Sequence, residues 1–586
     1  MMFEGRKTGW LPILIIFITV LIASRCARGP SRPALFFGTE ELSWVNRTLS
    51  RMTIEEKIGQ MISCAYLGYF VSSDSDYLKD LKTLIVRYKI GGLIIYGGNV
   101  YETAYFTNTL QRTARIPLLI ASDLERGTGN QISGATQFPP LMSVGAADSE
   151  ELAYAMGRIT AEEGRAIGIH MTYAPVVDVN INPDNPIINT RAIGEDPEQV
   201  SRLTMAFIRG CQENGMIATA KHFPGHGDTN QDSHLLLPVI QQNRERLDKI
   251  ELYPFKRAVE AGVQAIMTAH LYVPALDPTP NLPATLSPVI MTGLLRREMK
   301  FRGIIVSDAM TMGGITRYYA APDAALKAVE AGVDIIILPP QPEDVISSLI
   351  EAVRSGKIPE ARIDESVRRI LNAKARLGLH KRKRVNVESL ADRIATKENL
   401  GQAALAFESS ATLVKNETAV LPLSQSDKRI AVFSLSSDPG DYFAGRDFCN
   451  SVKKRCPRTQ IFYADADTGQ ERLDNAGKLA SGAETIVFAL FSSLRAEKGN
   501  VGLDVKHVRL IRKFAEGDVP VIVISFGSPY FLRDFPEVDA YLCLYRNTPQ
   551  TQEIAARVIF GEMETKGKLP VSLPGLYPLG HGLKLK

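Results

Sequence analysis

Cysteine is scarce and net charge is small in this sequence, and each shortage excludes a class of protein. The 586 residues include six cysteines, which form no disulfide framework pattern and have no zinc-site spacing. Cys449 and Cys456 are close enough in sequence to pair after export. A formal net charge of +4 gives no sign of a nucleic-acid partner, and the isolated basic run 381–384 indicates a solvated linker.

The N-terminus differs from the rest of the chain, which has the composition of an ordinary globular protein. Two basic residues precede an apolar run, Trp10–Ala23, which is short for a membrane span and has the length of a signal-peptide core. We therefore expect residues 1–29 to be a signal peptide or membrane anchor, and the protein to be exported, periplasmic or extracellular. Cys26 leaves a lipid anchor open, although Arg25 stands where a small residue usually precedes a lipidated cysteine. The alternative is a buried hydrophobic helix.

Short apolar runs alternate with helical patterns up to about residue 380. The predicted strands are Ile58–Cys64, Gly92–Tyr96, Pro117–Asp123, Met171–Val177, Met216–Lys221, Ala265–His270, Gly303–Asp308 and Val333–Leu338. Helical patterns lie between several of them, at Glu150–Ala166, Glu198–Asn214, Arg244–Ala261, Ser287–Met299 and Pro322–Ala331. This alternation predicts a (β/α)₈ barrel over residues 30–379, with an open doubly wound sheet as the alternative.

A second α/β region follows a polar segment. Residues 380–400 are predicted to be a linker, and residues 401–586 a smaller domain. Its predicted strands are Arg429–Leu435, Thr459–Tyr463, Thr485–Phe491, Val519–Ser525 and Ala540–Tyr545. Helical patterns between these strands predict a sheet covered by helices on both faces, an α/β sandwich.

Polar side chains end several of the predicted barrel strands. They are Asp123, Asp178, Lys221 with His222, His270 and Asp308. A barrel brings the carboxyl ends of all its strands to one face. Charged side chains at the ends of so many buried strands would not be needed for a purely structural sheet. The pattern therefore predicts an active site at that face.

The loop 221–234 is the segment richest in ionisable side chains, and it contains three of the eight histidines within thirteen residues. A proline and two glycines prevent it from continuing a strand or starting a helix. Asp232 can accept the imidazole N–H of His234, which fixes the tautomer and prepares that histidine to donate and later abstract a proton. The alternative is that Asp232 caps a turn and His234 packs.

Asp308 and a polar collar complete the candidate site. Asp308 ends an apolar strand and is therefore held rigidly, which suits a nucleophile or a charge stabiliser; a helix N-cap is the alternative. The collar could bind a polyhydroxylated ligand and consists of Asp123, Arg191, Lys221 and His222. For Arg191 the alternative is an ion pair within 194–197.

A metal site is the alternative use of the loop, with His222, His226, Asp228 and His234 as ligands. Its spacing is not that of common metal sites, because a proline and a glycine between the first two histidines prevent them from sharing a helix face. We predict neither a metal nor a cofactor.

The stretch from Lys221 to His234 resembles the signature K-H-F-P-G-(H/R)-G-D-x-x-x-D-S-H of glycoside hydrolase family 3, specifically of its β-N-acetylglucosaminidase branch. The resemblance covers roughly residues 40–580 and is also carried by Pro175–Asn180, Asn185–Arg191, Gly194–Pro197, Pro283–Ser287, Gly303–Met310 and Gly567–Val571. Two departures affect the expected substrate contacts. The family commonly reads E-G-G-R where this chain has Glu125–Thr128, and Ala192–Ile193 replaces a more usual small–aromatic pair.

The resemblance implies a retaining glycosidase that works through a glycosyl-enzyme intermediate. Asp308 would be the nucleophile, and His234, oriented by Asp232, would be the general acid and then the general base, in place of the usual second carboxylate. The implied contacts to the sugar in the −1 subsite are Asp123, Arg191, Lys221 and His222, whereas Asp178 and His270 match less directly.

The expected protein is an exported, two-domain exo-glycosidase, a β-N-acetylhexosaminidase. Its carbohydrate substrate would be terminal β-linked N-acetylglucosamine on peptidoglycan fragments or chitin-derived oligosaccharides. A β-glucosidase and a phosphorylase are the enzymatic alternatives, the latter because a neutral imidazole repels an incoming phosphate less than a carboxylate does. A catalytically inactive wall-sugar binding protein is the non-enzymatic alternative. The role of the second domain and the oligomeric state stay open.

Overall fold

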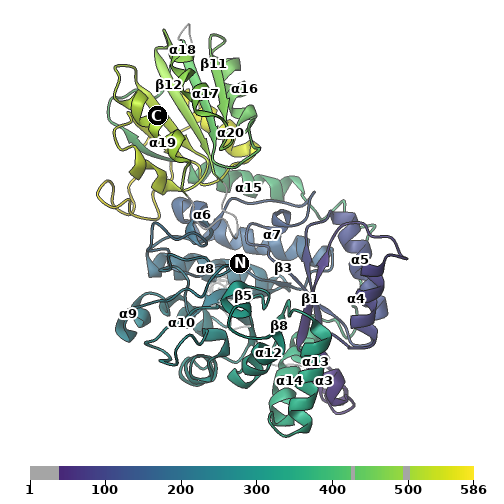
Figure 1. Ribbon diagram of the computed structural model, residues 1–586. Helices are drawn as coiled ribbons and strands as arrows, with labels where there is room; N and C mark the ends of the chain where they lie inside the picture. Colours follow the sequence, from purple (N-terminus) through teal and green to yellow (C-terminus); the bar gives the residue numbers. More distant parts are fainter. Residues whose placement is uncertain (1–37, 424–428, 493–501, 586) are drawn as a thin grey trace, which may run out of the picture.

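The computed structural model describes residues 38–423, 429–492 and 502–585. It consists of a barrel of strands and helices and a smaller sheet domain stacked on one end of it (Figure 1). The predicted signal peptide or anchor, residues 1–29, lies outside the described residues. Among the helices of the described ranges, none combines the length and the apolar character needed to cross a membrane.

The larger part is an eight-stranded parallel barrel. Its strands are β1 (Ile62–Leu67), β2 (Gly92–Tyr96), β3 (Leu119–Ser122), β4 (Met171–Thr172), β5 (Ile217–Phe223), β6 (Ala265–Thr268), β7 (Ile304–Val306) and β8 (Ile336–Ile337). Consecutive strands from β1 to β7 are neighbours, and β8 pairs with β1. A bridge between Val306 and Ile335 closes the ring. The predicted barrel is therefore confirmed, and the open sheet is excluded.

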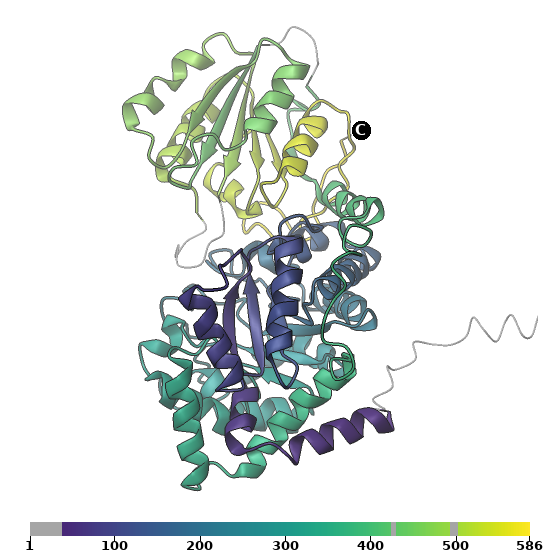
Figure 2. The same ribbon diagram turned by 90° about the vertical axis from the view of Figure 1, so that its right-hand side faces the viewer.

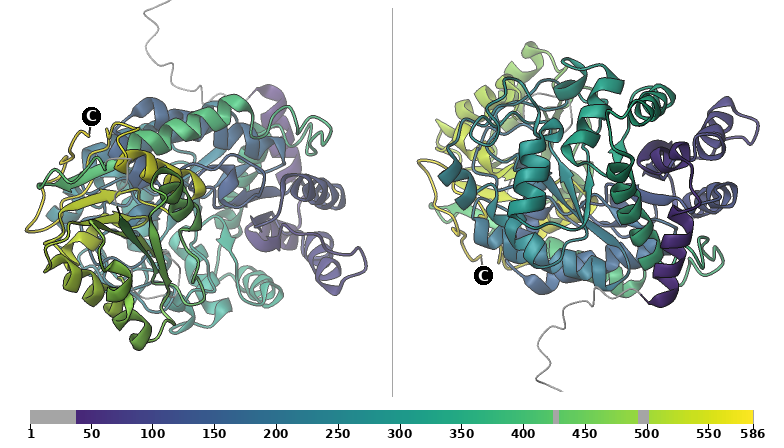
Figure 3. Two further views of the ribbon diagram at one scale, coloured as in Figure 1. Left: turned by 90° about the horizontal axis from the view of Figure 1, so that it is seen from above. Right: turned by 90° about the horizontal axis from the view of Figure 1, so that it is seen from below.

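Helices cover the outside of the barrel (Figure 3), because its strands are buried on both faces, as β5 is at every position. The helices are α2 (Thr39–Leu49), α3 (Ile54–Gln60), α4 (Asp76–Val86), α5 (Val100–Thr113), α6 (Leu141–Ala147), α7 (Glu150–Ala166), α8 (Pro197–Glu213), α9 (Arg244–Lys249), α10 (Tyr253–Glu260), η4 (Val289–Glu298), α11 (Gly313–Thr316), α12 (Ala321–Ala331), α13 (Pro342–Arg354) and α14 (Glu360–Arg376). Short turns of helix are η1 (Thr128–Asn130), η2 (Asn189–Arg191) and η3 (Ala284–Leu286).

Several predicted barrel elements have bounds that differ from those in the structure, and a local reason explains three of them. The predicted strand 58–64 begins too early, because Ile58–Gln60 end helix α3, which a capping box at Thr53 starts. The predicted helix 244–261 is broken into α9 and α10, with Pro254 in the first turn of the second. The predicted strand 171–177 is cut short, since Pro175 has no N–H to donate to a ladder.

The smaller part is a six-stranded sheet in the order β11-β10-β12-β13-β14-β9. Its strands are β9 (Thr412–Asn416), β10 (Ile430–Ser436), β11 (Gln460–Ala464), β12 (Thr485–Phe491), β13 (Val521–Ser525) and β14 (Ala540–Cys543). Helices α17 (Gln470–Asp474), α18 (Ala476–Ala480) and α19 (Val505–Ala515) pack on one face, and α16 (Arg446–Arg455) and α20 (Pro549–Ile559) on the other. The sandwich prediction is confirmed. The prediction missed β9, an antiparallel edge strand that follows α15 (Lys397–Ser410) without a turn signal.

The chain between the two parts is bound to the barrel. Helix α15 begins at Lys397, inside the range predicted as linker. Before it, Val385 exchanges two hydrogen bonds with the side chain of Asn108, at 2.8 and 2.9 Å. The buried carboxylate of Glu163 accepts hydrogen bonds from the Ala395 N–H and the Asn399 amide, at 2.8 and 2.9 Å. These buried polar contacts fix where the second domain starts.

The second domain lies over one end of the barrel (Figure 2). Direct hydrogen bonds join the two parts. The amide of Asn180, after β4, donates to the hydroxyl of Tyr530 at 3.1 Å. The backbone N–H of Glu195 donates to the carbonyl of Pro570 at 3.0 Å, and the Ser572 hydroxyl donates to the Glu195 carboxylate at 2.9 Å. The segments after β4 and near the C-terminus, far apart in sequence, therefore lie side by side.

The suggested disulfide between Cys449 and Cys456 is wrong. Cys449 lies inside α16 and Cys456 follows its last residue, seven positions later. Seven residues of α-helix span about 10 Å, well beyond the reach of a disulfide. Both side chains are buried, and no disulfide joins them.

Candidate active site

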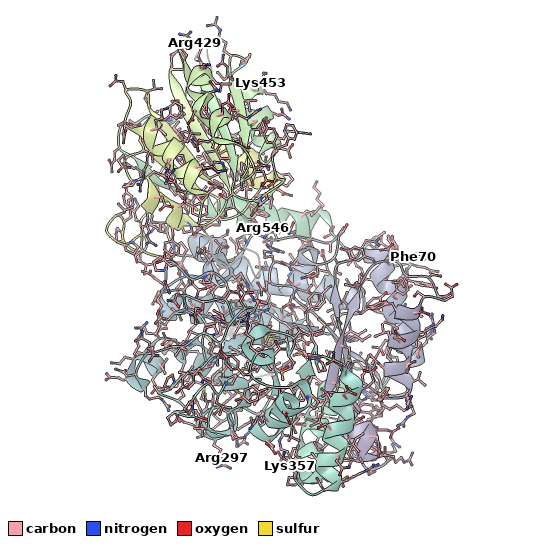
Figure 4. The ribbon with its side chains drawn as sticks, in the orientation of Figure 1. Phe70, Arg297, Lys357, Arg429, Lys453 and Arg546 are labelled. Carbon is pink, nitrogen blue, oxygen red and sulfur yellow. The ribbon has the colours of Figure 1, made fainter. Side chains whose placement is uncertain are left out.

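A cavity of about 730 Å³ lies where the carboxyl ends of the barrel strands meet the second domain. Of the residues that the sequence predicts as catalytic or sugar-binding, all line this cavity except Asp232, which lies behind His234. The strand-end residues Asp178 and His270 do not line it. The second domain contributes the opposite wall, which includes Asp438, Asp441, Phe491, Phe526, Ser528, Phe531, Tyr545 and Arg546. Figure 4 labels Arg546 at this junction.

Asp308 follows β7 at the centre of the barrel's end. Its backbone N–H donates to the Thr268 hydroxyl at 3.3 Å, and one of its carboxylate oxygens accepts the Ala309 N–H at 2.8 Å. Burial raises the pKa of this carboxyl, but the nearby imidazoles of His222 and His270 and the Ala309 N–H outweigh burial, so the pKa lies below its ordinary value. Asp308 is thus an ionised, fixed carboxylate, which is the state that a nucleophile needs.

His270 supports the strand ends behind Asp308. Its Nδ1 lies 2.8 Å from the Thr285 hydroxyl, and its Nε2 lies 3.1 Å from the Ala309 carbonyl. The Thr285 hydroxyl also lies 2.8 Å from that of Thr268, which receives the Asp308 N–H. This buried network holds the backbone on both sides of the Asp308 carboxylate.

The polar collar is organised around a carboxylate that the sequence analysis did not single out, Glu125. Arg191 binds it in a bidentate pair, with Nη2–Oε1 at 2.7 Å and Nε–Oε2 at 3.0 Å. Lys221 Nζ lies 2.8 Å from both Asp123 and Glu125. Burial raises the pKa of Glu125, but Arg191 and Lys221 together hold it well below its usual range. The alternative ion pair of Arg191 within 194–197 is therefore wrong.

Replacing Glu125 with glutamine is expected to lower the free energy of unfolding by about 3 kcal/mol, because the variant removes the shared anion from two buried cations. The folded-state pKa of Glu125 is depressed, so its contribution is fully present above about pH 4.5 and is lost as pH falls through the folded pKa. Urea unfolding at pH 7 and in acid measures both effects. Glu398→Gln, at an exposed pair with Arg158, serves as the control, and equal stability of the two variants at pH 7 would contradict the prediction.

His222 is held by Asp178, which lies on the segment between β4 and η2. The imidazole Nδ1 lies 2.7 Å from Asp178 Oδ2, and the His226 N–H donates to Asp178 Oδ1 at 2.7 Å. With the proton on Nδ1, the Nε2 of His222 is an acceptor and lies 3.4 Å from Arg191 Nη2. Burial raises the pKa of Asp178, but His222 and His226 outweigh this effect, so its pKa lies below the ordinary value. Asp178 therefore orients the collar from beneath it.

The Asp232–His234 pair predicted from the sequence is formed. His234 Nδ1 lies 2.7 Å from Asp232 Oδ1, which also accepts the His234 backbone N–H at 2.9 Å. The Asp232 side chain is 1% exposed, whereas that of His234 is 31% exposed and lines the cavity. Since Nδ1 is engaged by the carboxylate, the cavity side of the ring presents Nε2 for proton transfer.

The loop that carries this pair is held by hydrogen bonds within the loop and by hydrogen bonds from helix α11. The His226 imidazole joins the Thr229 hydroxyl, at 2.8 Å, to the Ser233 hydroxyl, at 2.9 Å. The carbonyls of Ser233 and His234 accept the N–H groups of Gly314 and Gly313, at 3.2 and 3.0 Å. The loop that carries His234 is thereby attached to the segment that follows Asp308.

The four side chains of the metal alternative are used otherwise. His226 bonds Thr229 and Ser233, and the carboxylate of Asp228 accepts the Gln242 amide at 2.8 Å. Across the ranges that the structure describes, no three His, Cys, Asp or Glu side chains are grouped as metal ligands.

The barrel sequence matches the Glycosyl hydrolase family 3 N terminal domain over residues 53–373, and the second part matches the family's C-terminal domain over residues 411–577. The chain belongs to glycoside hydrolase family 3. A β-N-acetylglucosaminidase/β-glucosidase of Cellulomonas fimi is 29% identical over 552 residues, covering 90% of this chain and 95% of that protein.

Two solved structures are similar over both parts. A family 3 β-N-acetylglucosaminidase from Paenibacillus sp. str. FPU-7 is 32% identical, with a TM-score of 0.79 and coverage of 89% of this chain and 99% of that one. A β-glucoside phosphorylase is 29% identical, with a TM-score of 0.84 and coverage of 93% and 98%. All three relatives are named for reactions on β-glycosides, and the sugars and reactions in their names differ.

Two parts of this family 3 site could not be predicted from the sequence. Glu125 lies in the segment where the chain departs from the family pattern, and Arg126 of that segment also lines the cavity. The second-domain wall comes from loops at strand ends more than 120 residues away from Asp308, and nothing in their sequences marks them as site residues.

Proposed function

We propose that this family 3 glycoside hydrolase is a retaining exo-β-N-acetylglucosaminidase. The observation that carries the proposal is the Asp232–His234 pair, with Nδ1 bound and the ring in the same cavity as the ionised Asp308. The similarity to the two N-acetylglucosaminidases adds support for the sugar. The N-terminal apolar run, Trp10–Ala23, supports export, and N-terminal sequencing of the mature protein would test it.

In the first half of the reaction, His234 gives the proton on Nε2 to the glycosidic oxygen while Asp308 attacks the anomeric carbon. The bond to the leaving group breaks and a glycosyl-enzyme ester forms. Asp232 stabilises the imidazolium form of His234 and holds its ring. In the second half, His234 takes a proton from water, which attacks the anomeric carbon and releases Asp308.

The collar would hold the sugar hydroxyls during both steps. Asp123 and Lys221 offer an acceptor and donors beside each other, at 2.8 Å. Arg191 is fixed by Glu125, and His222 by Asp178, so neither has to be ordered when substrate binds. Because these donors and acceptors are already held in place, a bound sugar can replace water at them without a further cost in side-chain ordering.

Phosphorolysis is the second candidate, favoured by the similarity to the β-glucoside phosphorylase. Hydrolysis of aryl β-N-acetylglucosaminide and aryl β-glucoside by the purified protein, with and without phosphate, separates the candidates. We expect turnover of the N-acetylglucosaminide with release of free sugar in either buffer. If sugar phosphate is the main product in phosphate buffer, the proposed activity is that of a phosphorylase and not of a hydrolase. Preference for the glucoside would overturn the proposed sugar.

A further inference from the structure

The base of the barrel, which is the end where its strands begin, presents cations and little exposed acid. It is formed by the loops that lead from a helix into the following strand. In these loops, between residues 87 and 335, the lysines and arginines are Arg87, Lys89, Arg115, Lys300 and Arg302. The one aspartate or glutamate in the same loops is Asp334, whose side chain is buried. The loops at the base are therefore basic toward solvent.

Asp334 joins two of the basic segments. Its carboxylate accepts hydrogen bonds from Arg296, in η4, and from Arg369, in α14, at 2.5 and 2.9 Å. Helix η4 leads into the loop 299–303, and α14 follows the turn 355–359. The cations of both segments therefore belong to one surface, the base cluster, which consists of Arg297, Lys300, Arg302 and Lys357.

The base cluster is open to a partner. Its four side chains are exposed, and Figure 4 shows Arg297 and Lys357 at the end of the molecule opposite the second domain. Within the described ranges, no ion pair involves a member of the cluster, whereas the carboxylates of Glu298 and Glu55 are paired with other arginines. The positive charge of the cluster is thus not neutralised by the protein itself.

Helix dipoles do not explain the cluster. Cations stabilise the last turn of a helix, which accounts for Arg297 in η4. Arg302 lies beyond that turn, next to β7. Lys357 precedes the N-terminus of α14, where the dipole favours anions. Helix stability alone therefore does not require these positions to be basic.

The chain also enters the described structure at the base. Helix α2, the first described helix, lies across that end (Figure 2). Its Asn46 side chain accepts a hydrogen bond from Arg368 of α14 at 2.7 Å, and Lys381 pairs with Glu40 at 2.8 Å. The predicted signal peptide or anchor, Trp10–Ala23, precedes α2 in the sequence. An anchor that is retained would therefore join the protein at its basic end.

A broad anionic surface fits this arrangement better than a small anion does. A small anion needs donors that converge on one point, whereas the cluster is distributed over separate loops. Each lysine or arginine near an anionic lipid surface strengthens binding by about fivefold, and the effect reaches about one Debye length. Several cations on one end of the barrel can therefore act together on a membrane.

We propose that the base cluster docks the protein on the anionic phospholipid surface of a membrane. The cavity lies at the other end of the barrel, under the second domain. Docking by the base therefore turns the cavity away from the lipid, toward the space from which a soluble glycoside arrives. The inference goes beyond the proposed function, because it concerns where the enzyme works and not what it cleaves.

Competition between two vesicle populations tests the docking surface. The full chain is equilibrated with equal amounts of phosphatidylcholine vesicles and of vesicles that also contain about 30% phosphatidylglycerol, and the populations are separated by density. A retained anchor inserts into both alike, so the ratio of bound protein reports the charged surface. We expect a ratio of about tenfold in favour of phosphatidylglycerol in dilute buffer, falling to about one in 1 M NaCl, where the Debye length is about 3 Å.

Two variants with the same loss of charge locate the effect. The base variant combines Arg297→Gln, Lys300→Gln, Arg302→Gln and Lys357→Gln, and its ratio should fall to about twofold or less. The control combines substitutions of exposed second-domain lysines, of which Figure 4 labels the first: Lys453→Gln, Lys454→Gln, Lys478→Gln and Lys513→Gln. The control should keep the wild-type ratio. Both variants should unfold in urea as wild type does, because the replaced side chains are exposed.

Three results would overturn the proposal. A wild-type ratio of about one would show that the base does not recognise anionic lipid. Equal losses in the two variants would assign the preference to net charge and not to the base cluster. Displacement of the protein from phosphatidylglycerol vesicles by a DNA duplex at equal phosphate concentration would assign the base to nucleic acid. None of these measurements uses catalysis, so each result leaves the proposed function as it stands.

Discussion

Replacing Asp308 with alanine is expected to lower kcat/KM for an aryl β-N-acetylglucosaminide by about four orders of magnitude. The variant loses the one carboxylate that is both buried at the strand end and kept ionised by His222 and His270. Without it, the proposed glycosyl-enzyme ester cannot form. Added azide should restore part of the turnover, because a small anion can enter the vacated space and attack the anomeric carbon.

The azide product makes this test decisive for the mechanism. A retaining enzyme without its nucleophile yields the α-glycosyl azide, since a single displacement inverts the anomeric carbon. Asp248→Ala is the control, at a partly exposed pair with Lys256 on the outside of the barrel, and it should keep wild-type activity. More than about 1% residual activity in Asp308→Ala without azide would rule out Asp308 as the nucleophile.

Replacing His234 with alanine should produce the second-largest effect, and its size should depend on the leaving group. Turnover of an unactivated disaccharide is expected to fall by about a thousandfold, the range of general acid catalysis. Formation of the glycosyl-enzyme from a dinitrophenyl glycoside should change little, because that leaving group departs without a proton. Rapid-mixing kinetics should then show a burst, since hydrolysis of the ester still lacks its base.

Two further variants test whether the effect of His234→Ala depends on the contact to Asp232 and on the position of the histidine in the cavity. Asp232→Asn keeps the shape of the pair but weakens the 2.7 Å contact to His234, so an intermediate loss is expected. His380→Ala, where the histidine packs on Trp44 away from the cavity, should behave as wild type. Equal losses on both substrates in His234→Ala would contradict the assignment and direct attention to Asp438 and Asp441, the carboxylates of the second-domain wall.

The second domain also contributes to the candidate site. It closes the cavity over the barrel, and hydrogen bonds such as that from Asn180 to Tyr530 hold it there. Covering the barrel end reduces the contact of its polar groups with water, which strengthens charge interactions among them. The second domain contributes lining residues such as Phe526 and Arg546, whereas the barrel supplies His234 and Asp308.

The amino-acid sequence by itself determined the parts of this protein that depend on neighbouring residues. Apolar runs at the spacing of strands predict the barrel, and the polar residues at their ends, from Asp123 to Asp308, reach one face because all parallel strands point the same way. The pair Asp232–His234 is also local, since two positions of one loop suffice to bring carboxylate and ring together.

Only the tertiary structure decided which distant groups complete the site. Glu125 forms ion pairs with Arg191 and Lys221, which lie 66 and 96 positions further along the chain. No local sequence pattern shows that pairing. Glu163, on the barrel, binds the side chain of Asn399 in α15 and so ties the end of the predicted linker to the barrel. Arg546 reaches the cavity because β14 ends there and Tyr545 turns the chain. Local propensity sets which elements form, but burial and charge pairing between distant segments decide which side chains meet.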